Sequence, residues 1–318
     1  MKTFLPSKDP LNEYKISSKS LDRLTDIADQ LPKLLLTSKI QKIINYLKIN
    51  HITVDLLIQN KNIRELKLAM VQLSFISHAY IWGAKIPSKA LPEALAKPWT
   101  QVANILGRPP ILSYASYCLD NWYRLNKKEN ISLENVGLLT NFLGGVDEDW
   151  FVTIHVCIED AAREAIAAAD SISKLNYKNS VKDFSDQLKL IISSLRKVNA
   201  TFSRMPEKCD PYVYYHRVRP FIFGTKDNPD LKKGLIYKNQ YNNKPQFFRG
   251  ETGAQSSIMP FLDGALGIYH TEDHLRHYLN EMRDYMPPKH RKSIEIVEKR
   301  SNAKSCILES KKLTFEFP

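Results

Sequence analysis

The chain has 318 residues, of which 43% are hydrophobic and 25% are charged, and these fractions are typical of soluble globular proteins. No segment approaches the ~20 apolar residues of a membrane span, and the start, MKTFLPSKDP, lacks the apolar run of a signal peptide. The sequence therefore predicts a cytoplasmic protein with no membrane contact, long enough for one large or two ordinary domains.

The 46 basic and 34 acidic side chains give a net charge of +12, which permits an anionic partner. Most basic residues are dispersed among acidic and apolar ones, as on a solvated helix face. The exception is the segment 289–304, which holds Lys289, Arg291, Lys292, Lys299, Arg300 and Lys304. No zinc-finger spacing or aromatic RNA-binding motif accompanies it, so we expect no nucleic-acid partner.

The four cysteines lie far apart in the sequence, at Cys118, Cys157, Cys209 and Cys306. They show no CxxC spacing, which argues against a disulfide framework or a structural zinc site and predicts reduced thiols. Nothing in the sequence sets the oligomeric state.

Apolar residues recur every three or four positions over much of the chain, which is the period of a helix. The segments are 21–36, 54–82, 162–176, 183–205 and 273–286. Only 11 glycines occur, and no series of hairpin turns separates alternating strands. The sequence predicts an all-α fold, with a small, mostly helical N-terminal domain over 1–125 and a large helical domain over 126–318. Breaks are expected at 82–99, 125–132 and 224–253.

His155 stands in the middle of a mostly apolar helical segment, EDWFVTIHVCIED (148–160). Phe151 precedes it by one turn on the same face, so we expect the phenyl ring to stack against the imidazole. Two interpretations of His155 remain open. It is either a core histidine that hydrogen bonds a backbone carbonyl or a histidine that faces a ligand.

Arg219 enters an aromatic and apolar run, CDPYVYYHRVRPFIFG (209–224). An arginine buried there needs a partner, because an unpaired buried charge is very costly. A substrate carboxylate, held through two parallel hydrogen bonds, is one solution, and an internal salt bridge to Asp or Glu is the other. Pro220 is expected to bias Arg219 away from regular helix.

The stretch RGETGAQSSIMPFLDGALGIYH (249–270) changes abruptly from a polar loop to an apolar segment. Gly250 and Gly253 leave the backbone room to approach a ligand, and Ser256 or Ser257 is in position to cap the helix that follows. The alternative is an ordinary capped loop, since the stretch matches neither a dinucleotide-binding motif nor a P-loop.

Three histidines follow at helical spacing, His270, His274 and His277. Two histidines spaced in this way can bind a transition metal on one helix face. Their neighbours are charged and polar, however, which favours the start of a solvated helix.

Taken together, these segments resemble the indoleamine 2,3-dioxygenase family, heme enzymes of tryptophan catabolism in the kynurenine pathway. The matching motifs occur in family order over about residues 20–292. They are AYIWG (79–83), LGRPPILSYASYCLDNW (106–122), the His155 helix, the Arg219 segment, NPDLKKGLIY (228–237), GAQSS (253–257) and MRDYMPPKHR (282–291). The resemblance implies a helical large domain that binds heme b, with the smaller domain packed against it.

The resemblance also implies a reaction and assigns residues to it. Both atoms of dioxygen are inserted across the indole C2–C3 bond of tryptophan or a related indoleamine, which gives N-formylkynurenine. His155 matches the distal catalytic position, and Phe151 and Tyr214 match aromatic positions around the indole. Arg219 matches the arginine that binds the substrate carboxylate. The segment Thr252–Ala254 matches a loop in which Thr252 reaches a heme propionate while Gly253 and Ala254 line the substrate pocket.

One departure from the family concerns the iron ligand. The family's proximal histidine lies on a long helix well beyond MPPKHR, whereas this sequence has 27 residues after Arg291 and its last histidine is His290. A C-terminally truncated relative is therefore expected, with its metal ligand unknown, weak or lost activity and exposed apolar surface on the large domain. The alternative is a non-enzymatic heme- or indole-binding module, or a degenerate remnant.

Overall fold

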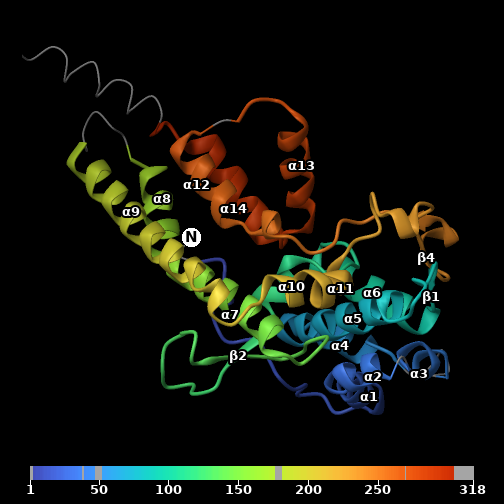
Figure 1. Cartoon of the computed structure of the whole chain (residues 1–318). Coiled ribbons are helices and arrows are strands. Elements are labelled where there is room, and N and C mark those ends of the chain that lie inside the picture. Colours follow the sequence, from blue (N-terminus) through green and yellow to red (C-terminus); the bar gives the residue numbers. More distant parts are fainter. Residues whose placement is uncertain (1–2, 38, 47–51, 176–180, 269, 304–318) are drawn as a thin grey trace, which may run out of the picture.

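The computed structural model describes residues 3–37, 39–46, 52–175, 181–268 and 270–303. Helices predominate in Figure 1, and the strands within the described ranges are short. The predicted all-α class is therefore confirmed.

The N-terminal part is built around α5 (Ile63–Trp82), which is buried without interruption over 68–81. A helix that is apolar on every side belongs in the interior of a protein. Four shorter helices pack against it and appear in blue in Figure 1. They are α1 (Lys19–Asp29), α2 (Leu31–Leu36), α3 (Ile40–Tyr46) and α4 (Asp55–Asn60).

The expected break at 82–99 begins at the end of α5, as predicted, but ends earlier than predicted, because α6 (Glu93–Leu106) starts inside it and contains Pro98. A proline in the second turn removes one backbone hydrogen bond, the one to Ala94. Pro98 and Trp99 are both buried and α6 packs against α5. Burial therefore offsets the lost hydrogen bond.

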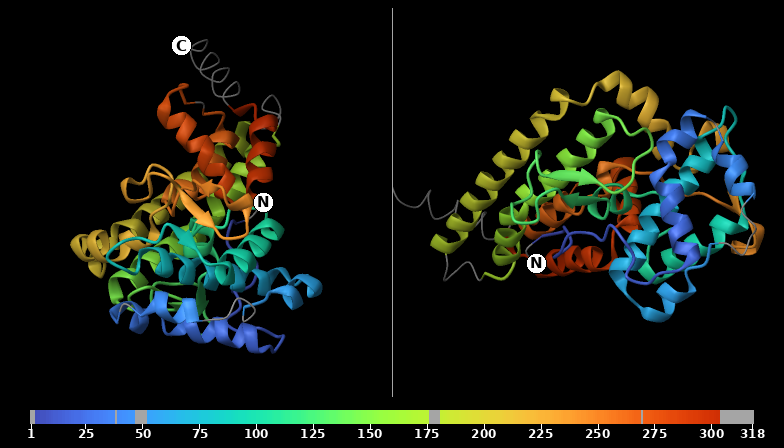
Figure 2. Two further views of the ribbon diagram at one scale, coloured as in Figure 1. Left: turned by 90° about the vertical axis from the view of Figure 1, so that its right-hand side faces the viewer. Right: turned by 90° about the horizontal axis from the view of Figure 1, so that it is seen from below.

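The C-terminal part has two groups of helices. The first comprises α7 (Val146–Ala161), α8 (Arg163–Ile172) and α9 (Val181–Ser203), which pack side by side. The second comprises α12 (Ile258–Leu266), α13 (His274–Met282) and α14 (Pro288–Arg300). Figures 1 and 2 place this second group at the opposite end of the molecule from α1, α2 and α3. Because α12 contacts both α8 and α14, it joins the two groups.

Two small sheets connect these helices. In one, β4 (Leu235–Tyr237) pairs in parallel with β1 (Ala90–Leu91) and antiparallel with β5 (Pro245–Gln246). In the other, β2 (Trp122–Arg124) pairs antiparallel with β3 (Val136–Leu138). The predicted break at 125–132 is the β2–β3 loop. The predicted break at 224–253 is an ordered segment that holds β4, β5 and short 3-10 turns.

The largest apolar core includes residues on both sides of position 125, among them Trp99, Tyr117, Phe142 and Val152. A second core lies between α8, α9, α12 and α14. The division into domains over 1–125 and 126–318 stays a prediction.

Large apolar side chains are exposed in both parts of the chain, so the expected exposed apolar surface of the large domain stays a prediction. Those on three C-terminal helices are Leu190, Ile192 and Phe202 on α9, Met259 on α12 and Leu275 on α13. Within the described residues, no helix is both long and apolar enough to cross a lipid bilayer. The cytoplasmic location stays a prediction.

Candidate functional site

His155 lies in the middle of α7 among aromatic rings. Its ring centroid is 4.3 Å from that of Phe151 and 5.9 Å from that of Tyr114. The predicted contact of Phe151 with the imidazole is confirmed, but the two rings are tilted by 37° rather than stacked in parallel. Phe151 stacks on Tyr214, with centroids 4.0 Å apart, and lies 6.3 Å from Tyr117. We call these five residues the aromatic cluster.

The hydrogen bond of His155 fixes its tautomer. Nδ1 lies 2.7 Å from the carbonyl oxygen of Phe151, and since a carbonyl only accepts, Nδ1 carries the hydrogen and Nε2 the lone pair. Burial lowers the pKa of His155, although the bond to Phe151 acts in the opposite direction. The ring is therefore neutral at pH 7. Nε2 has no hydrogen-bond partner in the described part of the chain, so His155 binds a carbonyl on one side and offers an acceptor on the other.

Glu159, one turn after His155, is completely buried. Its Oε1 accepts hydrogen bonds from the Tyr114 hydroxyl at 3.0 Å and the Ser256 hydroxyl at 2.7 Å. Burial raises the pKa of Glu159 to about 7, and the two hydroxyl donors lower it in part. Sequence reasoning assigned no role to Glu159. The sequence feature that could have identified Glu159 is its position one helical turn after His155, on the same face of α7.

Arg219 begins α11 (Arg219–Ile222), directly after the π-helical turn η5 (Tyr214–Val218). Its φ of −54° and ψ of −35° are helical, so the expected effect of Pro220 on its conformation was wrong. Pro220 lies in the first turn of α11, where backbone N–H groups have no partner within the helix. The wider π turn before it changes the backbone spacing at this point.

The side chain of Arg219 is exposed, which contradicts the expectation that it is buried and therefore needs a partner. Its guanidinium lies over the Tyr215 ring, 5.9 Å from the centroid. No residue of the described ranges forms an ion pair with it, so the internal salt bridge is not observed there. The guanidinium is free to bind an added carboxylate.

The loop 249–255 is held from two sides. The backbone N–H of Glu251 donates to the carbonyl of Ile222 at 3.1 Å, which ties the loop to the end of α11. Gln255 donates to the carbonyl of Gly250 and accepts from the backbone N–H of Tyr114, both at 2.8 Å. The loop therefore links the helix of Arg219 to the aromatic cluster.

Of the predicted site residues of this loop, Gly253 is exposed, whereas Thr252 and Ala254 are half-buried. Thr252 Oγ1 accepts a hydrogen bond from the backbone N–H of Ala254 at 3.4 Å. A Cβ atom on Gly253 would meet nothing within 4 Å. Ser257 is the N-cap residue of α12, as predicted, but its hydroxyl lies 3.3 Å from Nδ1 of His290 and makes no capping hydrogen bond.

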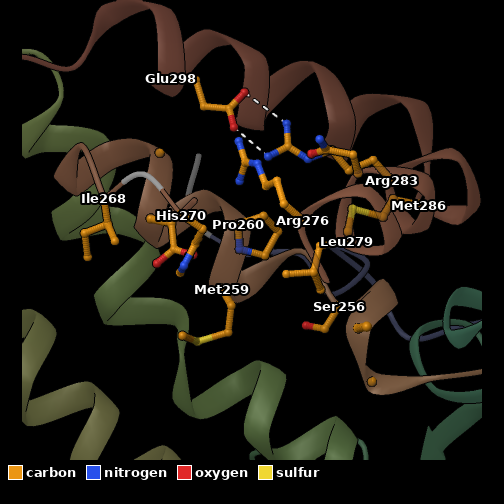
Figure 3. Close-up of a pocket in the computed structure, with 15 residues that line it drawn as sticks. Ser256, Met259, Pro260, Ile268, His270, Arg276, Leu279, Arg283, Met286 and Glu298 are labelled. Atoms are coloured by element: carbon orange, nitrogen blue, oxygen red, sulfur yellow. Dashed lines mark hydrogen bonds and ion pairs between the residues drawn. The ribbon is translucent and has the colours of Figure 1, made fainter. Parts of the chain in front are cut away.

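Gly253 and Ala254 also line a cavity of about 200 Å³ between the loop, α12, α13 and α14. Figure 3 shows that its wall combines apolar and polar side chains. The apolar ones are Met259, Pro260, Ile268, Leu279 and Met286, and the polar ones include Ser256, His270 and Arg276. Arg283 and Glu298 close one side through two hydrogen bonds of 2.6 and 3.0 Å.

Gly250→Ala is expected to lower the free energy of unfolding by about 2 kcal/mol, as overpacking does elsewhere. The new Cβ would lie 2.2 Å from the carbonyl oxygen of Ile222 and 2.3 Å from the nitrogen of Gly224, and backbone atoms cannot rotate away. Gly253→Ala is the matched control, with an expected change within about 0.5 kcal/mol. Urea unfolding measures both, and equal stability of the two variants would contradict the close contact.

The remaining described histidines are engaged in the core or lie at the surface. His78 has both ring nitrogens bonded, and His290 packs against Phe4. His216, His270, His274 and His277 are exposed. In the part of the chain that the structure describes, no three or more His, Cys, Asp or Glu side chains are grouped to hold a metal ion.

Comparison with known proteins gives a match over nearly the whole chain. The family model described as "Indoleamine 2,3-dioxygenase" matches residues 1–316. Indoleamine 2,3-dioxygenase 1 of Rattus norvegicus is 34% identical over 276 residues, which cover 86% of this chain and 66% of the rat protein.

Two fungal relatives give the same description. Indoleamine 2,3-dioxygenase nanC of Aspergillus nanangensis is 34% identical over 259 residues, or 76% of this chain and 61% of the relative. Indoleamine 2,3-dioxygenase of Saccharomyces cerevisiae is 31% identical over 324 aligned positions, or 96% of this chain and 70% of the relative. This chain thus spans less than two thirds of the rat and Aspergillus proteins.

Proposed function

This chain belongs to the indoleamine 2,3-dioxygenase family, and from that membership we propose that it forms the indole-binding side of a tryptophan dioxygenase pocket. The reaction proposed is the opening of the indole ring of L-tryptophan by dioxygen to give N-formylkynurenine. The observation that carries the proposal is the free Nε2 acceptor of a neutral His155, next to the rings of Phe151 and Tyr114.

Each residue of the site has a separate task in this proposal. Nε2 of His155 accepts the indole N–H, which orients the ring. The guanidinium of Arg219 binds the substrate carboxylate through two parallel hydrogen bonds. Phe151 and Tyr214 are already stacked on each other at 4.0 Å, so the indole packs against the outside of this pair. Holding the substrate in one orientation is the contribution of the protein to the rate.

Open space at Gly253 and the exposed side chain of Met259 support the binding of one face of a heme beside the loop. Gly253 has open space beside it and Met259 is 59% exposed, so a flat apolar group has access there. The cavity of about 200 Å³ is smaller than the ~300–1,000 Å³ of ordinary ligand pockets and does not enclose such a group by itself. Phe151, Gly253 and Met259 would pack against the heme, with Thr252 near a propionate. Heme, when bound, supplies the activation of dioxygen.

The axial iron ligand is proposed to come from outside the described residues. Of the described histidines other than His155, His78 is bonded on both ring nitrogens in the core. His290 is half-buried against Phe4 and the Ser257 hydroxyl, and the others are exposed. Heme that lacks this ligand loses both affinity and control of its electronic state. We expect weak turnover by the 318-residue polypeptide alone. The same observation favours the second candidate function, a binding module for heme or an indole without turnover.

The test is to supply the polypeptide with hemin, reduce it, and add L-tryptophan under ¹⁸O₂. We expect N-formylkynurenine that carries two ¹⁸O atoms, formed slowly, and an absorbance spectrum unlike that of a histidine-ligated heme. Fast turnover with a histidine-type spectrum would contradict the proposed origin of the ligand. Tryptophan binding without any product would support the binding module instead.

A further inference from the structure

Glu251 is an acidic residue of the loop 249–255 that sequence reasoning left without a role. It is half-buried, and its side chain makes no hydrogen bond or ion pair within the described ranges. Carboxylates removed from water normally have a partner, because desolvation of an unpaired charge is costly. A carboxylate of this kind inside a ligand site indicates a binding position for a cation.

The main chain fixes the position of Glu251. Its own N–H is bonded to the carbonyl of Ile222 at 3.1 Å. The preceding residue, Gly250, lies so close to Gly224 and Ile222 that no side chain fits between them. Gln255 holds the other end of the loop against Tyr114. These contacts hold the backbone of Glu251, so a substitution of its side chain leaves the backbone in place.

Glu251 stands on a loop whose backbone is bonded to Ile222 in the helix of Arg219 and which Gln255 bonds to Tyr114 of the aromatic cluster. Burial raises the pKa of Tyr114, Tyr117 and Tyr214 well above the ordinary range, and the charge of Glu251 raises each further. Burial raises the pKa of Glu251 itself to about 7, and the guanidinium of Arg219 lowers it in part. Glu251 and Arg219 thus interact through space without forming an ion pair.

An α-amino acid carries its ammonium and carboxylate groups on the same carbon atom. A site that binds both groups needs an acidic and a basic side chain near each other, yet unpaired, so that each is free for the ligand. Glu251 and Arg219 are candidates for such a pair, because the backbone of Glu251 is bonded to Ile222 at the end of the helix that Arg219 begins. Neither side chain forms an ion pair within the described ranges. In a site that binds indole acids without an amine, the carboxylate of Glu251 would have no group of the ligand to bind.

We propose that Glu251 binds the ammonium group of the substrate, so that Glu251 and Arg219 together select indole compounds that carry an α-amino acid group. This inference rests on the proposed function, since it assigns the two charges to the same indole site. It makes Glu251 a residue that determines substrate specificity. Its charge opposes the binding of indole acids that lack the amine.

Three ligands separate the two charges. L-tryptophan carries both groups, tryptamine only the ammonium, and indole-3-propionate only the carboxylate. Isothermal titration of the hemin-supplied polypeptide with each ligand, for wild type and Glu251→Gln, gives six dissociation constants. We expect Glu251→Gln to weaken tryptophan and tryptamine by about tenfold, the scale of a charge-assisted hydrogen bond. Indole-3-propionate should bind equally or more tightly.

Arg219→Ala is the reciprocal variant, which should weaken tryptophan and indole-3-propionate but not tryptamine. Gln has the shape of Glu, and an unchanged thermal unfolding midpoint verifies that the variant is folded. If Glu251→Gln tightens tryptophan, Glu251 competes for Arg219 and the inference is overturned. Unchanged affinity for tryptophan and tryptamine also overturns it, while leaving the proposed function in place. If no indole binds to wild type, the proposed function and this inference both fail.

Discussion

Arg219→Ala is expected to weaken L-tryptophan binding roughly 10- to 100-fold, because a hydrogen-bonded charge pair contributes about 1.5–3 kcal/mol. The guanidinium is exposed and has no ion-pair partner in the described ranges, although its charge acts on Glu251. The loss therefore combines the contact with the substrate carboxylate and the effect on Glu251. Titration calorimetry with L-tryptophan gives the affinity, and hemin uptake should not change.

Arg217→Ala is the matched control, because Arg217 is also exposed and lies two residues earlier in η5. The affinity of the Arg217→Ala variant for tryptophan should equal that of wild type. Indole, which has no carboxylate, should bind to wild type and to Arg219→Ala alike. An equal loss for indole would show that the substitution disturbs the pocket, which would count against the assigned contact.

His78→Ala is expected to lower the free energy of unfolding by about 3 kcal/mol. His78 is completely buried; its Nδ1 donates to the carbonyl of Phe221 at 2.6 Å, and Nε2 accepts from the N–H of Leu112 at 3.0 Å. Each backbone group left unsatisfied costs about 1–3 kcal/mol, and the cavity adds to this. Phe221 follows Arg219 in α11 and Leu112 precedes Tyr114, so tryptophan binding should weaken as well.

Burial lowers the pKa of His78 to about 4, although its bond to Phe221 raises it in part, whereas the unfolded chain has a value near ~6.5. The unfolded state therefore binds more protons between these values. The stabilisation by His78 is complete above pH 6.5 and is lost as the pH falls through 4. Urea unfolding at pH 7 and pH 4.5 should show a smaller difference between wild type and His78→Ala at the lower pH. The control variant is His277→Ala, because His277 is exposed. Its free energy of unfolding should equal that of wild type at both pH values.

The helical segments were predictable where a periodic apolar face is buried, as in α8 and α9. The start of α6 was not predictable, because the prolines in 82–99 indicated a break in helical structure. The burial of Pro98 and Trp99, which stabilises the helix there, depends on packing against another helix. The helical conformation of Arg219 also could not be predicted from the residues next to it in the sequence. The π turn η5 changes the spacing before Pro220, and nothing in the residue types encodes it.

At the site, sequence reasoning anticipated the contact of His155 with Phe151, since residues four apart on a helix touch. The contacts of Glu159 with Tyr114 and Ser256 join residues 45 and 97 positions apart, and no local pattern reveals such pairs. Glu251 was missed for the same reason. Its polar loop is unremarkable in sequence, and only the folding of 249–255 against α11 brings the acid to Arg219.

The most direct test of the indole pocket is a crystal structure of the hemin-supplied polypeptide with L-tryptophan. The account predicts that the indole N–H donates to Nε2 of His155, that the ring packs on Phe151 and that the carboxylate binds Arg219. Tryptophan bound elsewhere, or bound in this place with its carboxylate directed away from Arg219, would contradict the account.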